Sequence, residues 1–150
     1  MRALFVSVLC VASVSAASEV EVTEKQVPKA VLAAVAKKYP AAKPTGFSKE
    51  LEAGKTTYEV RLAEGTRKLD IDVSPSGELM AEEETIALEA APEAVRKAFA
   101  ASKYAGWEVK HVERAVQVGN EDAPTFEVLV VQGKQRAEIA FDKDGKLQKP

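Results

Sequence analysis

The chain has 150 residues, of which 46% are hydrophobic and 29% are charged, so it is long and apolar enough to bury a core. Its formal net charge is −2 at pH 7, and it contains one histidine and one cysteine. This composition excludes an internal disulfide framework and gives no electrostatic case for nucleic acid or an anionic membrane as a partner.

Residues 1–17 have the pattern of a secretory signal peptide. Met1 and Arg2 precede an apolar run over residues 3–14, and small side chains follow the run. The run is too short to span a bilayer, and signal peptidase accepts small residues at its cleavage site. We expect cleavage after Ala16 or Ala17, a periplasmic or secreted protein, and no stable membrane insertion afterwards. A retained amphipathic or membrane anchor is the alternative.

Cys10 lies inside this apolar run, after a leucine that is bulkier than the residue lipoprotein processing prefers. We expect Cys10 to be removed with the leader. The mature chain then has no cysteine, and without Arg2 it carries 20 basic and 23 acidic side chains. Its stability must therefore come from core packing rather than from disulfides.

A first helix of about three turns is predicted from Pro28 to just before Pro40. Proline suits the first helical turn, and Val31, Val35 and Tyr39 are spaced by four, which places them on one face. Beyond this helix the apolar period changes to two. This alternation and the short turns between the runs indicate antiparallel strands with one buried face.

The same order recurs after a linker at residues 86–91. Pro92 begins a second predicted helix with Val95 and Phe99 on its apolar face. Strands follow again, and the irregular alternation over residues 109–118 indicates a bulge.

The two halves align with each other. A shift of 68 places residues 58–79 on residues 126–147 with six identities in 22 positions, and it brings Gly77 onto Gly145. A shift of 64 aligns the two helices. The difference between the shifts predicts an insertion of four residues near residues 119–124, in the loop between the first two strands of the second copy.

These patterns predict an α+β fold, a tandem duplication of a helix plus a four-stranded antiparallel meander, with the helices packed on one face of the sheet. The predicted division is a signal peptide at residues 1–17, a first repeat at residues 18–86 and a second repeat at residues 87–150. The short linker places the halves side by side, with one continuous sheet as a possible arrangement.

Residues 69–79 and 137–147 both read as strand, turn, glycine and strand. Together with the leader, helix and meander, these hairpins resemble the PepSY-like family of exported proteins, which is related in fold to beta-lactamase-inhibitor protein. The resemblance covers nearly the whole mature chain, and its motifs are structural. It implies a noncatalytic module, since related PepSY domains occur in protease propeptides and inhibitory proteins. This chain lacks the cysteines that staple beta-lactamase-inhibitor protein.

The sequence predicts no enzyme, no cofactor and no metal ligand set. A catalytic base would have to be His111, the only histidine, which lies in a predicted strand between charged residues. A partly exposed strand histidine is the favoured interpretation. Structural zinc sites need four ligands of the Cys or His type and catalytic zinc sites usually need three, which a single histidine does not supply.

Asp142 and Asp144 imitate the start of a calcium loop. An EF-hand needs further oxygen ligands and a glutamate at its twelfth position. Counted from Asp142, that position would lie beyond Pro150. The first copy makes the corresponding turn with Ser74 and Ser76. We therefore interpret the two aspartates as turn formers, with calcium ligation as the alternative.

Acidic residues gather on strands that are predicted neighbours. Glu82, Glu83 and Glu84 follow one another, and Asp70 and Asp72 lie on the preceding strand. Because consecutive residues point to opposite faces of a strand, the three glutamates cannot share one surface. A solvated edge is the default, and a docking site for a basic partner or loosely held cations is the alternative.

The second copy carries apolar residues where the first carries charges. If residues 126, 128 and 130 face the core, Leu129 and Val131 face outward. Leu129 then takes the place of Arg61, and Ala140 takes the place of Asp72. An exposed apolar patch of this kind often marks a protein partner.

The leading hypothesis is a noncatalytic exported module, inhibitor-like, that binds an envelope or extracellular protein through its open sheet face. Leu129, Val131 and Ala140 form the apolar centre, Trp107 begins the neighbouring strand, and Asp70 belongs to an acidic rim. The structural alternative is that Trp107 lies in the core, or that the other half or a dimer mate covers this face. The alternative function is an envelope protein that binds a small ligand or divalent cation through acidic strand residues.

Overall fold

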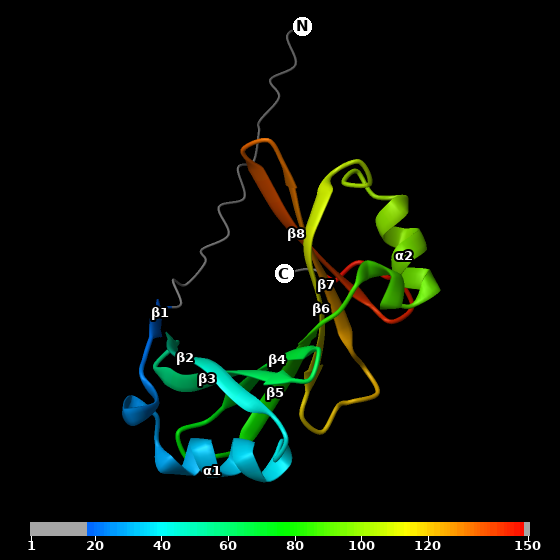
Figure 1. The fold of residues 1–150 in the computed structure, drawn as a ribbon. Helices are drawn as coiled ribbons and strands as arrows, with labels where there is room; N and C mark the ends of the chain where they lie inside the picture. The colour runs from blue at the N-terminus through cyan, green and yellow to red at the C-terminus, as the bar shows by residue number, and fades with distance from the viewer. Residues whose placement is uncertain (1–17, 149–150) are drawn as a thin grey trace, which may run out of the picture.

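The computed structural model describes residues 18–148. Within them, eight antiparallel strands form a single sheet in sequence order, β1 to β8, accompanied by two α-helices and two short 3-10 helices (Figure 1). This architecture confirms the α+β class. The predicted signal peptide, with Cys10 and the cleavage site, lies outside the described residues.

The elements follow one another in a simple meander. In chain order they are β1 (Ser18–Glu21), η1 (Glu24–Gln26), α1 (Lys29–Lys38), β2 (Lys43–Glu52), β3 (Lys55–Glu64), β4 (Arg67–Val73), β5 (Leu79–Thr85), η2 (Leu88–Ala90), α2 (Glu93–Ala100), β6 (Glu108–Gln117), β7 (Thr125–Gln132) and β8 (Gln135–Asp142). The predicted division between residues 86 and 87 falls between β5 and η2, and it stays a prediction.

Helix α1 packs through the stripe that the sequence predicts. Val31, Val35 and Tyr39 are all buried, and Pro28 stands at the N-cap position. They meet apolar side chains of β2, β3 and β4 in a first core. Burial of these side chains is the main source of stability for this half, because each fully buried valine or leucine contributes about 1.5–3 kcal/mol.

Helix α2 covers eight residues and is shorter than α1. Val95 and Phe99 are buried in a second core with residues of β6, β7 and β8. The chain leaves the helix at Ala101, and the Ser102 side-chain oxygen accepts a hydrogen bond from the backbone N–H of Tyr104 at 3.1 Å. This local bond offers the backbone an alternative to a further helical turn.

The predicted four strands are present in the first half as β2 to β5. In the second half, within residues 18–148, β6 to β8 are followed only by an isolated bridge between Phe141 and Leu147. This bridge is the counterpart of the pair between Val73 and Leu79 in the first half. Strand β1 was not predicted, because its four exposed residues have no buried face.

Corresponding contacts recur in the two halves. The backbone N–H of Ser74 donates to the Glu78 carbonyl at 2.8 Å, and that of Asp142 donates to the Lys146 carbonyl at 3.0 Å. The predicted bulge is confirmed by a register shift between Val109 and His111. The predicted insertion lies in the loop between β6 and β7, which is longer than the loop between β2 and β3.

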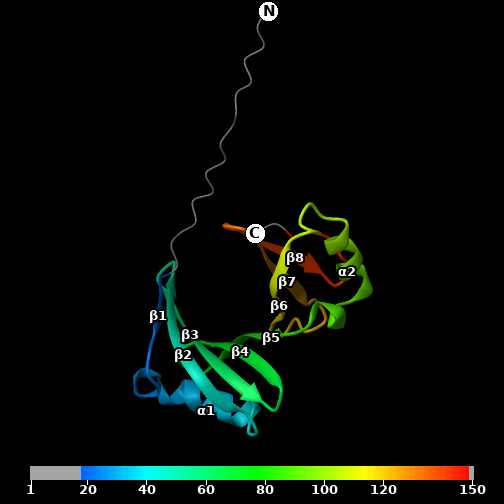
Figure 2. The same ribbon diagram turned by 45° about the horizontal axis from the view of Figure 1, so that its top comes forward.

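Both helices cover the same face of one continuous sheet. Strand β5 pairs with β6 and joins the halves, with Glu82 opposite Val116. The registers keep the strand residues of both apolar cores on one side. Figure 2 shows that the sheet bends between its halves, with α1 and α2 on the outside of the bend. The opposite side, which we call the helix-free face, lines the inside.

Candidate functional site

The helix-free face carries a group of carboxylates at the middle of the sheet. Strand pairing aligns Arg61 of β3 with Asp70 of β4, and Asp70 with Glu83 of β5. The next rows align Glu59 with Asp72 and Glu113 with Glu127. We call this group the acidic cluster: Glu59, Asp70, Asp72, Glu83, Glu113 and Glu127.

Partial burial raises the pKa of several carboxyls in the acidic cluster. The pKa of Glu83 rises to about 8, first because of burial and then because of the charges of Glu113 and Asp72. Burial and the charge of Asp70 raise the pKa of Glu59 to about 7. Burial also raises the pKa of Asp72 to about 6. The charge of these three carboxyls therefore changes near neutral pH.

Two further members of the acidic cluster, Asp70 and Glu127, follow the same pattern. Burial raises the pKa of Asp70, with a further contribution from Glu113, and burial raises the pKa of Glu127, with a further contribution from Glu138. Few cations offset these charges. The Arg61 guanidinium contacts Glu21 and lies 3.8 Å from Glu59, and His111 Nε2 lies 2.6 Å from a Glu113 oxygen.

A pocket of about 190 Å³ opens in the first half of this face. Its carboxylates come from the five strands β1 to β5: Glu19, Glu50, Glu59, Asp72 and Glu83. The Ser48 side chain is only 1% exposed, and its hydroxyl donates to Glu59 at 3.5 Å. Within residues 18–148, no group of three or more His, Cys, Asp or Glu side chains is arranged to hold a metal ion.

The predicted apolar residues lie on this same face, in the second half. Leu129 pairs with Glu138, and Ala140 pairs with Glu127, so the apolar side chains border the acidic cluster. Leu129, Val131 and Ala140 are half-buried. The structure brings these three residues together, and Asp70 lies on the same face across β5 and β6. Their role in partner binding stays a prediction.

Trp107 lies apart from these residues. It packs against the second core on the helix side and meets the Tyr104 ring edge-to-face, with 5.0 Å between ring centroids. This position corresponds to the structural alternative, in which the tryptophan supports the core.

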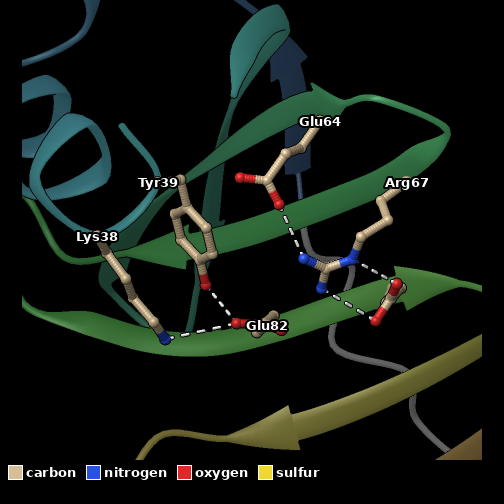
Figure 3. Close-up of polar contacts among 6 residues, drawn as sticks. Lys38, Tyr39, Glu64, Arg67 and Glu82 are labelled. Carbon is tan, nitrogen blue, oxygen red and sulfur yellow. Dashed lines mark hydrogen bonds and ion pairs between the residues drawn. The ribbon is translucent and has the colours of Figure 1, made fainter. Parts of the chain in front are cut away.

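Glu82 and Glu84 point to the helix side, as the alternation predicts. The Tyr39 hydroxyl donates a hydrogen bond to Glu82, and Lys38 lies 3.4 Å from the same carboxylate (Figure 3). Arg67 pairs with Glu84 at 2.8 Å. Burial and the Glu82 carboxylate raise the pKa of Tyr39. Glu82 and Asp70 therefore lie on opposite faces and cannot form one ligand site.

Asp142 acts in the turn that the sequence predicts. Its Oδ1 atom accepts hydrogen bonds from the backbone N–H groups of Asp144 at 3.0 Å and Lys146 at 2.9 Å. Ser74 accepts the corresponding bond from Glu78 at 3.1 Å in the first half. His111 lies in β6 with a side chain that is 37% exposed, in agreement with a partly exposed strand histidine.

No pattern in the sequence marks Glu59, Glu113 and Glu127 as members of a site. Their alternation with apolar neighbours placed them on the outer face of their strands. Only the pairing across the five strands β3 to β7 shows that these outer faces meet at one concave place.

Comparisons with known proteins agree with this fold. A structure from Bacteroides eggerthii, described as putative periplasmic proteins, superposes with a TM-score of 0.71 at 21% identity over 82% of this chain and 86% of that chain. A DUF2874 family protein from Bacteroides uniformis gives a TM-score of 0.69 at 22% identity over 81% and 86%. At these identities the likeness shows the fold alone. No curated protein gave a match.

A third similar structure is described as a BLIP-like protein from Bacteroides fragilis, with a TM-score of 0.64 and 25% identity over 81% of this chain and 84% of that chain. Among the described residues, no helix is long and apolar enough to cross a membrane.

The family model described as "Putative beta-lactamase-inhibitor-like, PepSY-like" matches residues 14–81 and again residues 56–149. The chain belongs to this PepSY-like family.

Proposed function

We propose that this protein is a noncatalytic exported binding module, inhibitor-like, that holds a protein partner on the helix-free face of its sheet. The observation that carries this proposal is the acidic cluster beside Leu129, Val131 and Ala140 on the inside of the bend. A concave face with an apolar part and a charged part offers both contact area and orientation to a partner.

The energetics of the acidic cluster support a binding role. Partial burial beside the charges of Glu113 and Asp72 opposes the ionisation of Glu83, as its raised pKa indicates. The fold gains nothing from this repulsion. A partner that presents lysine or arginine side chains would restore the charged forms and recover that free energy on binding.

The family and its similar structures support the cellular context. Two of the similar structures are described as a putative periplasmic protein and a BLIP-like protein. We propose a periplasmic or secreted location for this chain, with the leader at residues 1–17 removed. We also propose that the two halves arose by duplication, because corresponding turns and helix contacts recur at the shifts of 68 and 64.

A site-specific photocrosslinker tests the partner surface. Placed at Leu129 in the mature protein, it should capture one envelope protein from the native envelope fraction. Capture should be lost when Val131→Lys is added and should be retained when Lys97, exposed on α2, is changed to glutamate. Unchanged capture with Val131→Lys, in a variant that keeps its unfolding midpoint, would exclude this surface.

The second candidate function is binding of a small cationic ligand, and the pocket beside Ser48 favours it. Calorimetric titration with calcium and with a diamine distinguishes the candidates. Saturable heat that disappears in Asp72→Asn would support a small-ligand site. Heats equal to those of dilution would exclude binding of these small ligands and would favour binding of a protein partner.

A further inference from the structure

Strand β8 is the last strand of the sheet, and part of its outer edge is open. The hairpin pairs Gln132 with Gln135 around a two-residue turn, so the backbone groups of Gln135, Ala137 and Ile139 face β7. The backbone groups of Arg136, Glu138 and Ala140 then face outward. The Ala140 carbonyl accepts a bond from the N–H of Gln148 at 2.8 Å. Within residues 18–148, no strand covers Arg136 or Glu138.

The first half shows what covers the corresponding edge there. Asp70 of β4 is the counterpart of Glu138 under the shift of 68, and it pairs with Glu83 of β5. In the second half a cavity of about 560 Å³ opens beside the edge, lined by Tyr104, Ile139 and Leu147 among others. The outer edge of β8 therefore has unpaired backbone groups at the position where β4 pairs with β5 in the first half. An added strand from another molecule binds at edges of this kind.

The side chains at this edge carry opposite charges. Arg136 and Glu138 both lie on the helix-free face and are exposed. Among the ion pairs of residues 18–148, neither one takes part. The neighbouring carboxylate is Glu127, which repels Glu138. An arginine side chain from another molecule, placed at this edge, would lie near both Glu127 and Glu138.

We propose that β8 pairs antiparallel with β8 of a second copy of this chain, with Ala137 on the two-fold axis. Arg136 of each copy then lies directly opposite Glu138 of the other, and each such pair exchanges both backbone hydrogen bonds. Registers centred on Arg136 or Glu138 place like charges directly opposite, which destabilises a sheet. The small side chain of Ala137 leaves room at the axis. The result is one sheet across two copies.

The opposite edge of the sheet is unsuited to such pairing. Strand β1 has four residues, and two of them, Glu19 and Glu21, are acidic residues of the same face. Every antiparallel self-pairing of β1 brings glutamates opposite each other. Short, charged strands of this kind protect an edge from association. The dimer therefore closes at β8 and does not continue into a fibre.

Charge reversal at the edge tests the register. In sedimentation velocity over a concentration series, the mature wild-type chain should form a dimer. Arg136→Glu and Glu138→Arg should each weaken self-association about tenfold or more, since both cross-strand pairs become repulsive. An equimolar mixture of the two variants should form a mixed dimer, and the double variant should dimerise like wild type. A wild-type monomer at every concentration, or a double variant as weak as the singles, would overturn the proposal.

Cysteine cross-linking tests the axis independently of charge. The only cysteine of the sequence, Cys10, is excluded from the mature form, so an introduced thiol has no competitor. Ala137→Cys should form an intermolecular disulfide readily, because residues opposite each other at the axis have Cβ atoms about 4.5–5.5 Å apart. Ala140→Cys on the same strand is the control and should cross-link slowly. Equal rates for the two variants, or growth into larger polymers through β1, would overturn the register.

Discussion

Gly77 lies directly against the first turn of α1, where an ideal Cβ on the glycine would be 2.7 Å from the carbonyl oxygen of Ala30. The glycine also has a φ of +89°. The turn between β4 and β5 therefore fixes the distance between helix and sheet. Gly145 and Ala94 make the corresponding contact in the second half.

Gly77→Ala is expected to lower the free energy of unfolding by about 2–4 kcal/mol, from backbone strain and from the clash with α1 together. Gly65→Ala is the matched control, because Gly65 has a φ of +61° but no atom within 4 Å of its ideal Cβ. It should cost only about 1 kcal/mol. Urea denaturation measures both. Equal losses would show that the helix contact contributes nothing.

The acidic cluster should make stability depend on pH. The pKa of Glu83 is about 8 in the folded state, against 4.5 for an ordinary glutamate, so the folded protein binds this proton more tightly than the unfolded chain does. The free energy of unfolding should therefore be highest near pH 5 and should fall as the pH rises from about 5 to 8. Asp70, Asp72, Glu113 and Glu127 face Glu83 from the neighbouring strands and act in the same direction.

Glu83→Gln should remove part of this dependence. At pH 8 the variant should be more stable than wild type by about 1 kcal/mol, after allowance for solvent screening, and at pH 5 the two should be nearly equal. Glu93→Gln, on the exposed surface of α2, is the control. Thermal unfolding at the two pH values measures the effect. A gain of the same size at both would show that charge repulsion is not its source.

Neighbouring residues of β7 should respond very differently to truncation. Val128 is fully buried in the second core, whereas Leu129 lies half-buried on the helix-free face. Val128→Ala should cost about 2 kcal/mol, and Leu129→Ala should cost less than about 1 kcal/mol although it removes more atoms. Chemical denaturation compares the two. A larger loss at Leu129 would mean that another part of the chain covers this face.

Asp142 should be replaceable by the residue of the first half. Asp142→Ala should lower stability by about 1 kcal/mol, because the N–H groups of Asp144 and Lys146 lose their acceptor. Asp142→Ser, which copies Ser74, should retain most of that stability. Calcium should leave the melting temperature of wild type unchanged. A calcium-dependent rise in wild type that Asp142→Ser abolishes would instead identify a calcium loop.

Much of the fold was predictable because its signals are local. The stripe of Val31, Val35 and Tyr39 predicts α1, and the alternation in β3, β4, β7 and β8 predicts the buried face correctly. The shift of 68 also aligns Gly77 with Gly145, and the structure places each of these glycines against the helix of its own half. These features depend on neighbours in sequence, which a periodic pattern records.

The rest depends on pairing between distant segments. Strand β1 has no apolar pattern of its own and forms because β2 offers it an edge. The acidic cluster needs the register of five strands, and each of its members looks like an ordinary surface residue in its own strand. The position of Trp107 depends on Tyr104 and α2, which the strand pattern does not describe.

The strict sequence order of the eight strands has a consequence for how the chain acquires its structure. Each strand pairs with the strand that precedes it in the chain, so no strand must wait for a segment that is made later in order to find its first partner. The first half can complete its core before α2 has been synthesised, and the free edge of β5 then serves as the template on which β6 assembles. A chain delivered from its N-terminus, whether by a ribosome or by a translocation pore, can therefore fold in the order in which it arrives.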